Sequence, residues 1–449
     1  MTAPTIAPAT TSENAPETGA AETATAETAT AALSARETLR LCTAGSVDDG
    51  KSTFVGRLLH DTKSVLADQL ASVERTSADR GFEGLDLSLL VDGLRAEREQ
   101  GITIDVAYRY FATDKRTFIL ADTPGHVQYT RNTVTGMSTS QVVVLLVDAR
   151  NGVVEQTIRH LTVAKLLGVR TVILAVNKID LVDYSQQRFD EIKAEFDAKA
   201  GELGIEEPHV VPISALRGDN VAERSDATPW YTGPTVLELL ESIPVQRGRA
   251  DDLDFRFNIQ VVLREHASDY RAYAGRVNAG SITVGDEILA PYGRTTTVAG
   301  IDTADGPVDT AHAGDSVALR LADDIDLTRG DLLAAHTRPE DTREFDATVV
   351  GLNEKDLRAG QAVKLRIGTA FVRARVASVE RVLDIDGAEG DNTAPEAVAL
   401  NDIAHVTIQT ADELPVEQYA ARGAVGNFLL VDQASGNTLA AGLVGKRLR

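Results

Sequence analysis

Between Glu37 and Pro244, five short apolar runs rich in Val, Ile and Leu alternate with stretches that have the spacing of amphipathic helices. Each run ends on a turn or a polar residue. The runs read RLCTAG, TFILADTP, QVVVLLVDA, RTVILAVNK and HVVPISA. This alternation predicts a mostly parallel sheet with helices on both faces. In open sheets of that class, ligands bind beyond the carboxyl ends of the strands, which is where the polar motifs of this sequence fall.

The residue pattern of the sequence changes after Pro244. Short β-like runs separated by Gly and Asp turns extend to about Ala335 and resume at Phe345 after a charged joint, HTRPEDTRE. Such regular short strands predict two all-β barrels. Residues before Glu37 are rich in Ala, Thr, Glu and Pro and offer almost nothing to bury, which is typical of a disordered segment. We therefore expect a disordered leader over residues 1–36, an α/β domain over 37–245, and β-barrels over 251–338 and 343–449.

The overall composition excludes several classes of protein. A net charge of −22 disfavours a protein whose main task is to grip nucleic acid, because phosphate contacts need clustered Lys and Arg. A single cysteine, Cys42, rules out an internal disulfide framework and favours a cytoplasmic protein. No apolar run reaches membrane-spanning length, and the N-terminus does not have the pattern of a signal peptide. We expect neither a nucleic acid nor a membrane among the partners.

One segment follows the pattern GxxxxGK[ST] of loops that bind nucleotide phosphates. It lies between the predicted strand RLCTA and the predicted helix TFVGRLLHD, which is the context that this mechanism needs. Backbone N–H groups can wrap the phosphates there, and the start of the helix adds a positive field. Lys51 is expected to reach the β and γ phosphates, and Ser52 to bind Mg²⁺. The expected phosphate-binding residues are Gly45, Ser46, Val47, Asp48, Asp49, Gly50, Lys51, Ser52 and Thr53.

Two further segments carry groups suited to Mg²⁺ and to an attacking water molecule. Asp122, in DTPGH, follows the apolar run FIL, where a carboxylate can hold Mg²⁺ through water. Gly125 can present its N–H to the γ-phosphate, and His126 directly after it is a candidate for orienting the water. Thr103, in EQGITI, is the candidate second hydroxyl ligand of Mg²⁺. From the residues alone, Thr103 could also simply begin a strand.

Two segments after later strands are suited to reading a purine base. The tetrapeptide NKID, residues 177–180, closes the run TVILAV. The carboxylate of Asp180 can accept from both N1–H and the exocyclic amine of guanine, a donor pair that adenine lacks. Asn177 would tie the loops together, and the stem of Lys178 can cover the flat face of the base. The next strand, VVPI, is followed by Ser214, Ala215 and Leu216, where a backbone N–H could meet guanine O6. Together with the phosphate loop, these segments predict that the chain binds GTP and Mg²⁺.

In this order, the phosphate loop, the Gly-Ile-Thr-Ile segment, DTPGH and NKxD resemble the motifs of the translation-factor class of GTPases. The layout of one α/β domain and two barrels is similar to that of elongation factor Tu and elongation factor 1A. The resemblance implies the fold class: an α/β P-loop GTPase domain with a mostly parallel sheet and helices on both faces, followed by two all-β barrel domains.

Within that class the sequence resembles most the large GTPase subunits of bacterial sulfate adenylyltransferase. The phosphate loop GSVDDGKST is one match, and elongation factors usually have a histidine where Ser46 and Asp49 stand. The similarity extends from about Glu37 to the C-terminus and is weaker in the barrels, where GRVNAGSITVGDEI and DDIDLTRGDLL carry it. The other matching segments are GRLLHDTK, LLVDGLRAEREQGITIDVAYRYF, ADTPGHVQYTRN, VNKIDLVDYS and PWYTGPTVLE.

This resemblance implies a division of labour between two subunits. The chain would hydrolyse GTP and couple this hydrolysis to the formation of adenosine 5′-phosphosulfate and pyrophosphate from ATP and sulfate. A smaller catalytic subunit would transfer the adenylyl group, within a heterodimer or a higher assembly. The chain itself has no SGGxDS loop or HxGH motif that could handle the α-phosphate of ATP. Its one phosphate loop also argues against the form fused to adenylylsulfate kinase, which needs a second such loop.

The same resemblance implies a role for each motif residue. Lys51, Thr103 and His126 form the catalytic set. Ser52 and Thr103 would bind Mg²⁺ directly, and Asp122 would bind it through water. The guanine-binding residues would be Asn177, Lys178, Asp180, Ser214, Ala215 and Leu216.

Two other interpretations stay open. The first is an elongation-factor-like translational GTPase that binds tRNA, which the phosphate-loop variant, the flank DVAYRYF and the acidic charge disfavour. The second is a regulatory scaffold that binds GTP without hydrolysing it. The intact Lys51, Thr103, Asp122 and His126 argue against such a scaffold.

Overall fold

The computed structural model describes most of the chain from Glu37 to Leu448. The expected leader and Thr103 lie outside the described residues. The residues that are not described are 1–36, 80, 82–84, 92–104, 127–129, 206–207, 245–249, 251, 266–269, 384–394, 421–424 and 449.

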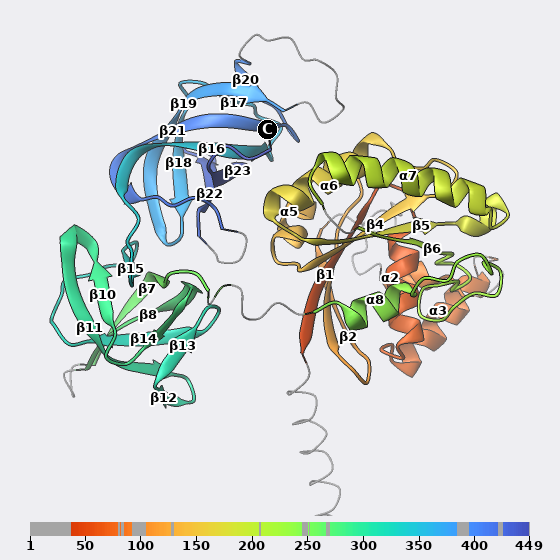
Figure 1. The fold of residues 1–449 in the computed structure, drawn as a ribbon, viewed down its shortest axis with the longest axis horizontal. Coiled ribbons are helices and arrows are strands. Elements are labelled where there is room, and N and C mark those ends of the chain that lie inside the picture. The colour runs from red at the N-terminus through yellow and green to blue at the C-terminus, as the bar shows by residue number, and fades with distance from the viewer. Residues whose placement is uncertain are drawn as a thin grey trace, which may run out of the picture.

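The first part of the described chain is built around one six-stranded sheet (Figure 1). The strand order is β2–β3–β1–β4–β5–β6, and every neighbouring pair is parallel except β2 with β3. The mostly parallel sheet predicted from the sequence is therefore confirmed. The strands are β1 (Thr38–Gly45), β2 (Ala107–Ala112), β3 (Thr117–Asp122), β4 (Val142–Asp148), β5 (Thr171–Asn177) and β6 (His209–Pro212).

Five of these strands coincide with the five apolar runs, and β2 is the additional one. It lies at the edge of the sheet and pairs only with β3. Its burial is uneven, and the side chains of Tyr108 and Tyr110 are 41% and 67% exposed. An edge strand with one solvent face does not produce a continuous apolar run, and for this reason the run pattern did not indicate β2.

Helices cover both faces of the sheet, as the sequence predicted (Figure 1). Successive residues of the fully buried strand β4 point into two separate cores, with Val143 and Leu145 on the α5–α7 side and Val142 and Val144 on the α2–α8 side. No helix within the described ranges is long and apolar enough to cross a membrane. One face carries α5 (Thr130–Ser138), α6 (Glu155–Leu167) and α7 (Gln186–Glu202), and the other carries α2 (Lys51–Asp61), α3 (Ala67–Asp79) and α8 (Val236–Ser242).

The second part of the chain is all β. Its main sheet runs β10–β15–β7–β8–β14–β11–β12, and an extra pairing of β10 with β11 closes it on itself. The closed sheet surrounds an apolar core that includes Phe255, Phe257 and Tyr273. The strands are β7 (Arg256–Glu265), β8 (Tyr270–Ala279), β9 (Ser281–Thr283), β10 (Glu287–Ala290), β11 (Arg294–Thr303), β12 (Gly306–Val308), β13 (Thr310–His312), β14 (Ser316–Leu321) and β15 (Leu332–Ala334).

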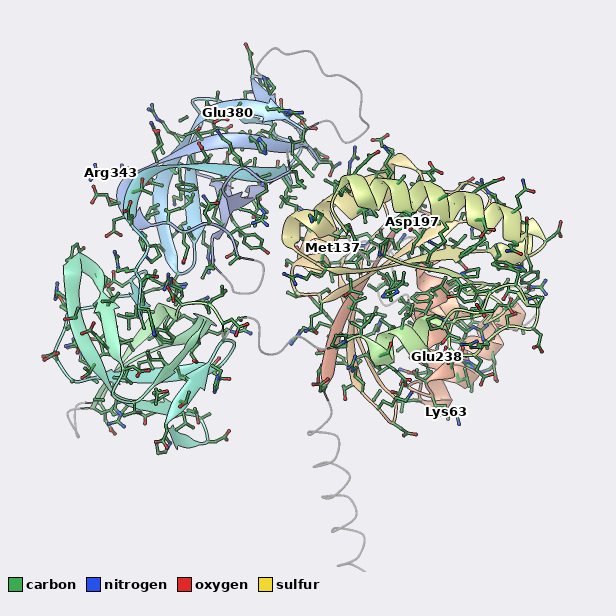
Figure 2. The ribbon with its side chains drawn as sticks, viewed as in Figure 1. Lys63, Met137, Asp197, Glu238, Arg343 and Glu380 are labelled. Atoms are coloured by element: carbon green, nitrogen blue, oxygen red, sulfur yellow. The ribbon has the colours of Figure 1, made fainter. Side chains whose placement is uncertain are left out.

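The third part contains a closed six-stranded barrel in the order β16–β21–β19–β18–β22–β23. Charged side chains such as Arg343 and Glu380 lie on its outer surface (Figure 2). The all-β barrel predicted for this part is confirmed, and its strand pairs are antiparallel. The strands are β16 (Asp341–Gly351), β17 (Leu357–Arg358), β18 (Ala362–Ile367), β19 (Ala370–Val382), β20 (Ala397–Val398), β21 (Ile403–Pro415), β22 (Asn427–Asp432) and β23 (Thr438–Val444).

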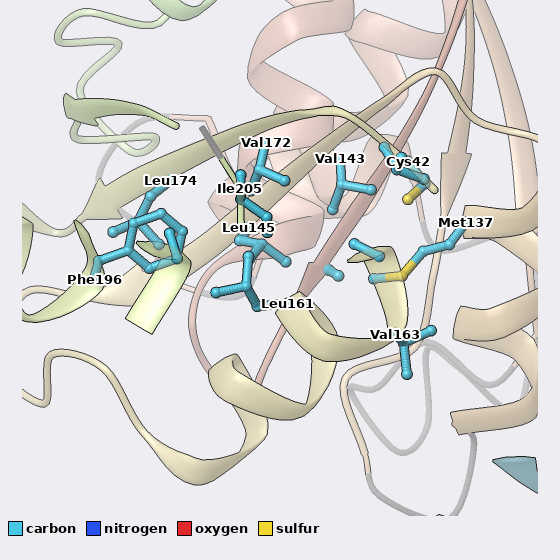
Figure 3. Packing of buried hydrophobic residues seen from close by; sticks show 14 of the residues in the cluster. Cys42, Met137, Val143, Leu145, Leu161, Val163, Val172, Leu174, Phe196 and Ile205 are labelled. Carbon is cyan, nitrogen blue, oxygen red and sulfur yellow. The ribbon is translucent and has the colours of Figure 1, made fainter. Parts of the chain in front are cut away.

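This barrel shares a buried cluster with the α/β part, which we call the seam. Val350, Leu352, Ile403 and Leu443 of the barrel belong to the same apolar cluster as the α5–α7 face of the sheet. Figure 3 shows the α/β side of that cluster, including Cys42 beside Met137 and Val143. The hydroxyl of Tyr419 also donates a 2.8 Å hydrogen bond to the carbonyl of Leu167 at the end of α6.

Candidate nucleotide-binding site

The predicted phosphate loop joins the end of β1 directly to the start of α2. β1 ends at Gly45 and α2 begins at Lys51. Gly50 caps the helix in the left-handed conformation (φ 89°), and a Cβ there would lie 2.4 Å from Nδ2 of Asn177. Glycine is therefore required at this position. The loop lies beside the free N–H groups of the first turn of α2, which suits an anion.

The ammonium of Lys51 is folded back over this loop. Its Nζ donates to the carbonyl oxygens of Gly45 at 2.9 Å and Ser46 at 2.7 Å, and the residue is only 7% exposed. Burial lowers the pKa of Lys51, while the nearby carboxylates of Asp49, Asp122 and Asp48 oppose this shift. A phosphate oxygen at this point can replace the two carbonyls as acceptor without moving the stem of the side chain far.

Asp49 stabilises the loop through a hydrogen bond within it. Its carboxylate accepts a 2.6 Å hydrogen bond from the backbone N–H of Ser46, and the residue is nearly buried. Burial raises the pKa of Asp49, and the Ser46 N–H and the Lys51 ammonium act in the opposite direction. This residue, where elongation factors usually have histidine, therefore acts here as an internal brace of the loop.

Asp122 lies next to the phosphate loop because β3 pairs in parallel with β1. The pairing sets Asp122 opposite Thr43, whose hydroxyl donates to Oδ1 of Asp122 at 3.0 Å. Both residues are fully buried. The hydroxyl of Thr123 donates in turn to the carbonyl of Thr43. The Asp122 carboxylate is thus held in a fixed orientation at the carboxyl end of two adjacent strands.

Gly125 brings the DTPGH segment into contact with the phosphate loop. A Cβ on Gly125 would lie 2.6 Å from the carbonyl oxygen of Gly45 and 2.2 Å from Nζ of Lys51, so no larger residue fits. His126 follows directly and is half-buried. The structure therefore brings Lys51, Asp122, Gly125 and His126 to one place.

Asn177 joins the predicted phosphate loop to the loop that contains Ala215. Its Nδ2 donates to the carbonyl of Asp49 at 2.8 Å, and its Oδ1 accepts from the N–H of Ala215 at 2.9 Å. The side chain is nearly buried at the end of β5. Three segments that are far apart in the sequence are therefore held at one edge of the sheet.

Lys178 lies along the outside of the phosphate loop. Its ammonium donates to the carbonyl of Asp48 and forms a 3.0 Å ion pair with Asp148, the last residue of β4. Burial on its own would raise the pKa of Asp148, but hydrogen bonds from Arg150 and Lys178 outweigh it and lower that pKa to about 2. Asp148 therefore stays ionised and fixes Lys178 beside the predicted phosphate loop.

Asp180 and Ser214 lie on two neighbouring loops and both contact Arg217. The side chain of Asp180 is 7% exposed, and its Oδ2 lies 3.5 Å from Nε of Arg217. The hydroxyl of Ser214 accepts from the backbone N–H of Arg217 at 3.2 Å. Arg217 itself is 64% exposed, so its guanidinium can move away from Asp180 at little cost.

The backbone of Ala215 and Leu216 is held from two sides. Asn177 accepts from the Ala215 N–H, and Nε of Arg57 donates to the Ala215 carbonyl at 3.0 Å. The guanidinium of Arg57 also donates to the Leu216 carbonyl. The N–H of Leu216 has no acceptor within the described part of the chain.

A buried histidine, His160 on α6, interacts electrostatically with Lys51. It is 1% exposed, and its Nε2 lies 3.0 Å from Nε2 of Gln156. Burial, with smaller contributions from Lys51 and Arg159, lowers the pKa of His160 to about 3. The ring is therefore neutral at physiological pH.

Sequence reasoning missed several of these residues, for different reasons. Asp148 ends an apolar run as Asp122 and Asn177 do, so the same strand-end rule could have identified it. Arg57, Arg217 and His160 carry no such signal, because their partners lie on loops and helices distant in the sequence. Of the predicted set, only Thr103 falls outside the described residues.

Two family models match the chain. The Elongation factor Tu GTP binding domain matches residues 36–245, and the GTP-eEF1A C-terminal domain-like model matches residues 344–445. Together with the phosphate loop and the sheet order, these matches make the chain a P-loop GTPase of the translation-factor class.

The curated relatives narrow this class. Sulfate adenylyltransferase subunit 1 of Bacteroides fragilis is 45% identical over 417 residues, which are 92% of this chain and 87% of that protein. The protein of the same name from Vibrio vulnificus is 46% identical, with 92% and 87% covered. The Bifunctional enzyme CysN/CysC of Mycobacterium tuberculosis is 50% identical over 90% of this chain and 67% of its own length. The chain belongs to the sulfate adenylyltransferase subunit 1 family, which confirms the resemblance found in its sequence.

Proposed function

We propose that the chain is the GTP-hydrolysing subunit of a sulfate adenylyltransferase whose adenylyl transfer is carried out by a separate small catalytic subunit. The observation that carries this proposal is the identity of about half the residues over nearly the whole chain with proteins named as subunit 1 of that enzyme. The intact phosphate loop and the guanine-side segments beside it support GTP as the nucleotide of this subunit.

The chemistry explains why such an enzyme needs a second nucleotide. A sulfate oxygen attacks the α-phosphorus of ATP, the bond to the β-phosphate bridge breaks, and pyrophosphate leaves. The product contains a phosphosulfate anhydride, whose high energy makes the reaction unfavourable on its own. Hydrolysis of GTP to GDP and phosphate, when coupled to this step, supplies the missing free energy.

The residues of the site suit GTP in the following way. The Lys51 ammonium exchanges its two carbonyl acceptors for β- and γ-phosphate oxygens, and the N–H groups of residues 46–53 surround the phosphates. Asp180 accepts from N1–H and the exocyclic amine of guanine, with the Arg217 guanidinium displaced outward. The N–H of Leu216 donates to guanine O6, while the N–H of Ala215 stays bonded to Asn177. The stem of Lys178 covers the flat face of the base.

The oxygen atoms at the carboxyl ends of β1 and β3 and at the start of α2 also suit Mg²⁺. Ser52 offers a hydroxyl in the first turn of α2, and the buried Asp122 offers a carboxylate already oriented by Thr43. We assign Ser52 and Thr103 as direct ligands and Asp122 as a ligand through water. Bound Mg²⁺ would neutralise charge on the β- and γ-phosphate oxygens. His126, directly after the glycine that contacts the phosphate loop, is assigned the orientation of the attacking water.

The proposed partner is the small catalytic subunit, in a heterodimer or a higher assembly, and the proposed compartment is the cytoplasm. The single, buried Cys42 and the net charge of −22 support a cytoplasmic protein without a nucleic-acid partner.

The test is to co-express the chain with the sulfate adenylyltransferase small subunit of the same organism and to measure adenylylsulfate and pyrophosphate formation. We expect formation to rise severalfold when GTP is added, and not with a non-hydrolysable GTP analogue. The Lys51→Ala variant should lose this stimulation. Equal product formation with and without GTP, or GTP hydrolysis stimulated only by ribosomes, would contradict the proposal.

A further inference from the structure

Arg57 connects the phosphate-binding helix to the loop that faces the base. It lies on α2, six positions after Lys51, and its side chain is 16% exposed. Its Nε donates to the carbonyl of Ala215 at 3.0 Å, and a second nitrogen donates to the carbonyl of Leu216. The third nitrogen lies 3.5 Å from Asp61, one turn further along the same helix. All three nitrogens of the guanidinium therefore have an acceptor.

The Ala215 carbonyl belongs to the same peptide unit as the Leu216 N–H, and the Leu216 carbonyl belongs to the next peptide unit. Because a peptide unit is planar, fixing the carbonyl of Ala215 also fixes the direction of the Leu216 N–H. Asn177 holds the same backbone from the opposite side through the Ala215 N–H at 2.9 Å. The Leu216 side chain is 50% exposed and does not anchor the loop in the core. Arg57 is thus the contact that sets the orientation of this donor.

We propose that Arg57 is a positioning residue for guanine selectivity, which acts by aiming the Leu216 N–H at guanine O6. The inference rests on the proposed base-reading role of Ser214, Ala215 and Leu216. Arg57 would act through the backbone carbonyls of Ala215 and Leu216. A planar guanidinium with several donors in one fork suits two adjacent carbonyls, which a lysine ammonium cannot hold in the same geometry.

A role in base selection differs measurably from a general structural role. Guanine carries O6 and N1–H, whereas 2-aminopurine keeps the exocyclic amine but has neither O6 nor N1–H, so only guanine can accept from the Leu216 N–H. A misdirected Leu216 N–H weakens binding of the first base and leaves binding of the second almost unchanged. A loss of fold would weaken both nucleotides by the same factor.

The experiment compares the binding of GDP with that of 2-aminopurine riboside 5′-diphosphate by calorimetry on the full chain. We expect Arg57→Ala to weaken GDP about tenfold, the effect of losing hydrogen bonds to a charged donor, and to weaken the analogue less than twofold. Arg57→Lys should give an intermediate loss of GDP affinity. Asp61→Asn removes the ion pair with Arg57 and changes the contact of Asp61 with His60, but leaves both carbonyl contacts of Arg57, so it should bind both ligands like the unmodified chain.

The matched control is Arg75→Ala on α3, since Arg75 is exposed and donates only to a carbonyl of its own helix. This variant should bind both nucleotides normally. Equal weakening of GDP and the analogue in Arg57→Ala, or an unchanged preference for GDP in Arg57→Ala and Arg57→Lys, would overturn the role of Arg57 alone. If the unmodified chain shows no preference for GDP over the analogue, the base-reading assignment itself is wrong. Arg57→Lys decides the question if Arg57→Ala does not fold.

Discussion

At the scale of single residues, Asn177 connects two segments of the site that are far apart in the sequence. Its two hydrogen bonds reach partners 128 and 38 positions away in the sequence. Both partners are backbone groups, so the amide can act as the same connector whatever side chains surround it. The geometry of the phosphate loop and that of the base loop therefore depend on one side chain.

Replacing Asn177 by Ala should affect both binding and stability. It leaves the carbonyl of Asp49 and the N–H of Ala215 without a partner in nearly buried positions, which costs about 1–3 kcal/mol for each group. We expect GDP affinity to fall at least tenfold by calorimetry and the melting temperature to drop by several degrees. Asn427→Ala, at an exposed position of β22, is the control. Unchanged GDP affinity in Asn177→Ala would contradict this account.

His160 should make the stability of the chain depend on pH below neutrality. Its folded pKa of about 3 lies below the ordinary value of 6.5, so the unfolded chain binds the proton more readily. The stabilising contribution is therefore complete above about pH 6.5 and is lost as pH falls towards 3. Between pH 7 and pH 5 the loss is on the order of 2 kcal/mol.

The measurement for His160 is urea unfolding at both pH values, followed by the fluorescence of Trp230. Trp230 is the only tryptophan and packs against α7, so it reports on the α/β part of the chain. The His160→Gln variant should lose less stability than the unmodified chain on going to pH 5. His336→Gln, at an exposed position, should behave like the unmodified chain. The same pH dependence in His160→Gln would contradict the prediction.

Residue-scale contacts divide into those that a sequence can reveal and those that it cannot. Lys51, Asp122 and Asn177 end or follow apolar runs, and parallel strands bring their carboxyl ends to one edge, so their proximity could be predicted. The brace between Asp49 and Ser46, and the clamp of Arg57 on the Ala215 carbonyl, could not. These contacts depend on loop conformation and on helix rotation, which apolar periodicity does not determine.

At the scale of elements, β1 is the strand that holds the neighbouring parts of the site together. It pairs with β3 on one side and β4 on the other, and it is almost wholly buried from Leu41 onwards. The run pattern identified β1 because both faces are covered. The same pattern did not reveal β2, whose outer face is exposed, which shows that apolar runs indicate burial rather than strands as such.

Cys42 on β1 offers a chemical measure of the opening of this strand. It is fully buried, and burial raises the pKa of its thiol to about 12, with a small opposing effect from Ser140. Because the thiolate is the reactive form, the folded protein should resist a disulfide reagent at pH 8. Labelling should occur only through opening, and added GDP should slow it further.

The readout for Cys42 is the rate of thiol release with an aromatic disulfide reagent. The chain has one cysteine, so the unfolded protein in concentrated guanidinium chloride should react at a single site. Rapid complete labelling of the folded chain on mixing would show that β1 is accessible and would contradict the described burial.

At the scale of the whole molecule, the seam makes the α/β part and the C-terminal barrel interdependent. The barrel contributes four buried apolar residues to the α5–α7 cluster, and Tyr419 adds a hydrogen bond to the end of α6. The layout of one α/β domain and two barrels was expected from the change in residue pattern after Pro244. The seam was not, because the apolar residues that form it look the same in sequence as residues of a barrel core.

Tyr419→Phe should weaken the seam without disturbing either part internally. The ring keeps its packing against Arg447, and only the hydrogen bond to Leu167 is lost. We expect a loss of about 1 kcal/mol and a broader or split transition in scanning calorimetry, since the two parts then unfold less cooperatively. Tyr292→Phe is the control, because Tyr292 is 86% exposed. An identical, single sharp transition in Tyr419→Phe would contradict this role.

The seam can form only late during synthesis of the chain. The sheet and its helices are complete at about residue 244, whereas Leu443, which covers their outer face, leaves the ribosome about 200 residues later. At a translation rate of roughly 5–20 residues per second, the apolar α5–α7 face stays uncovered for about 10–40 s before the barrel can pack on it. During that interval the nascent chain presents a surface that a chaperone can bind, and slower translation of the barrels would prolong its exposure to aggregation.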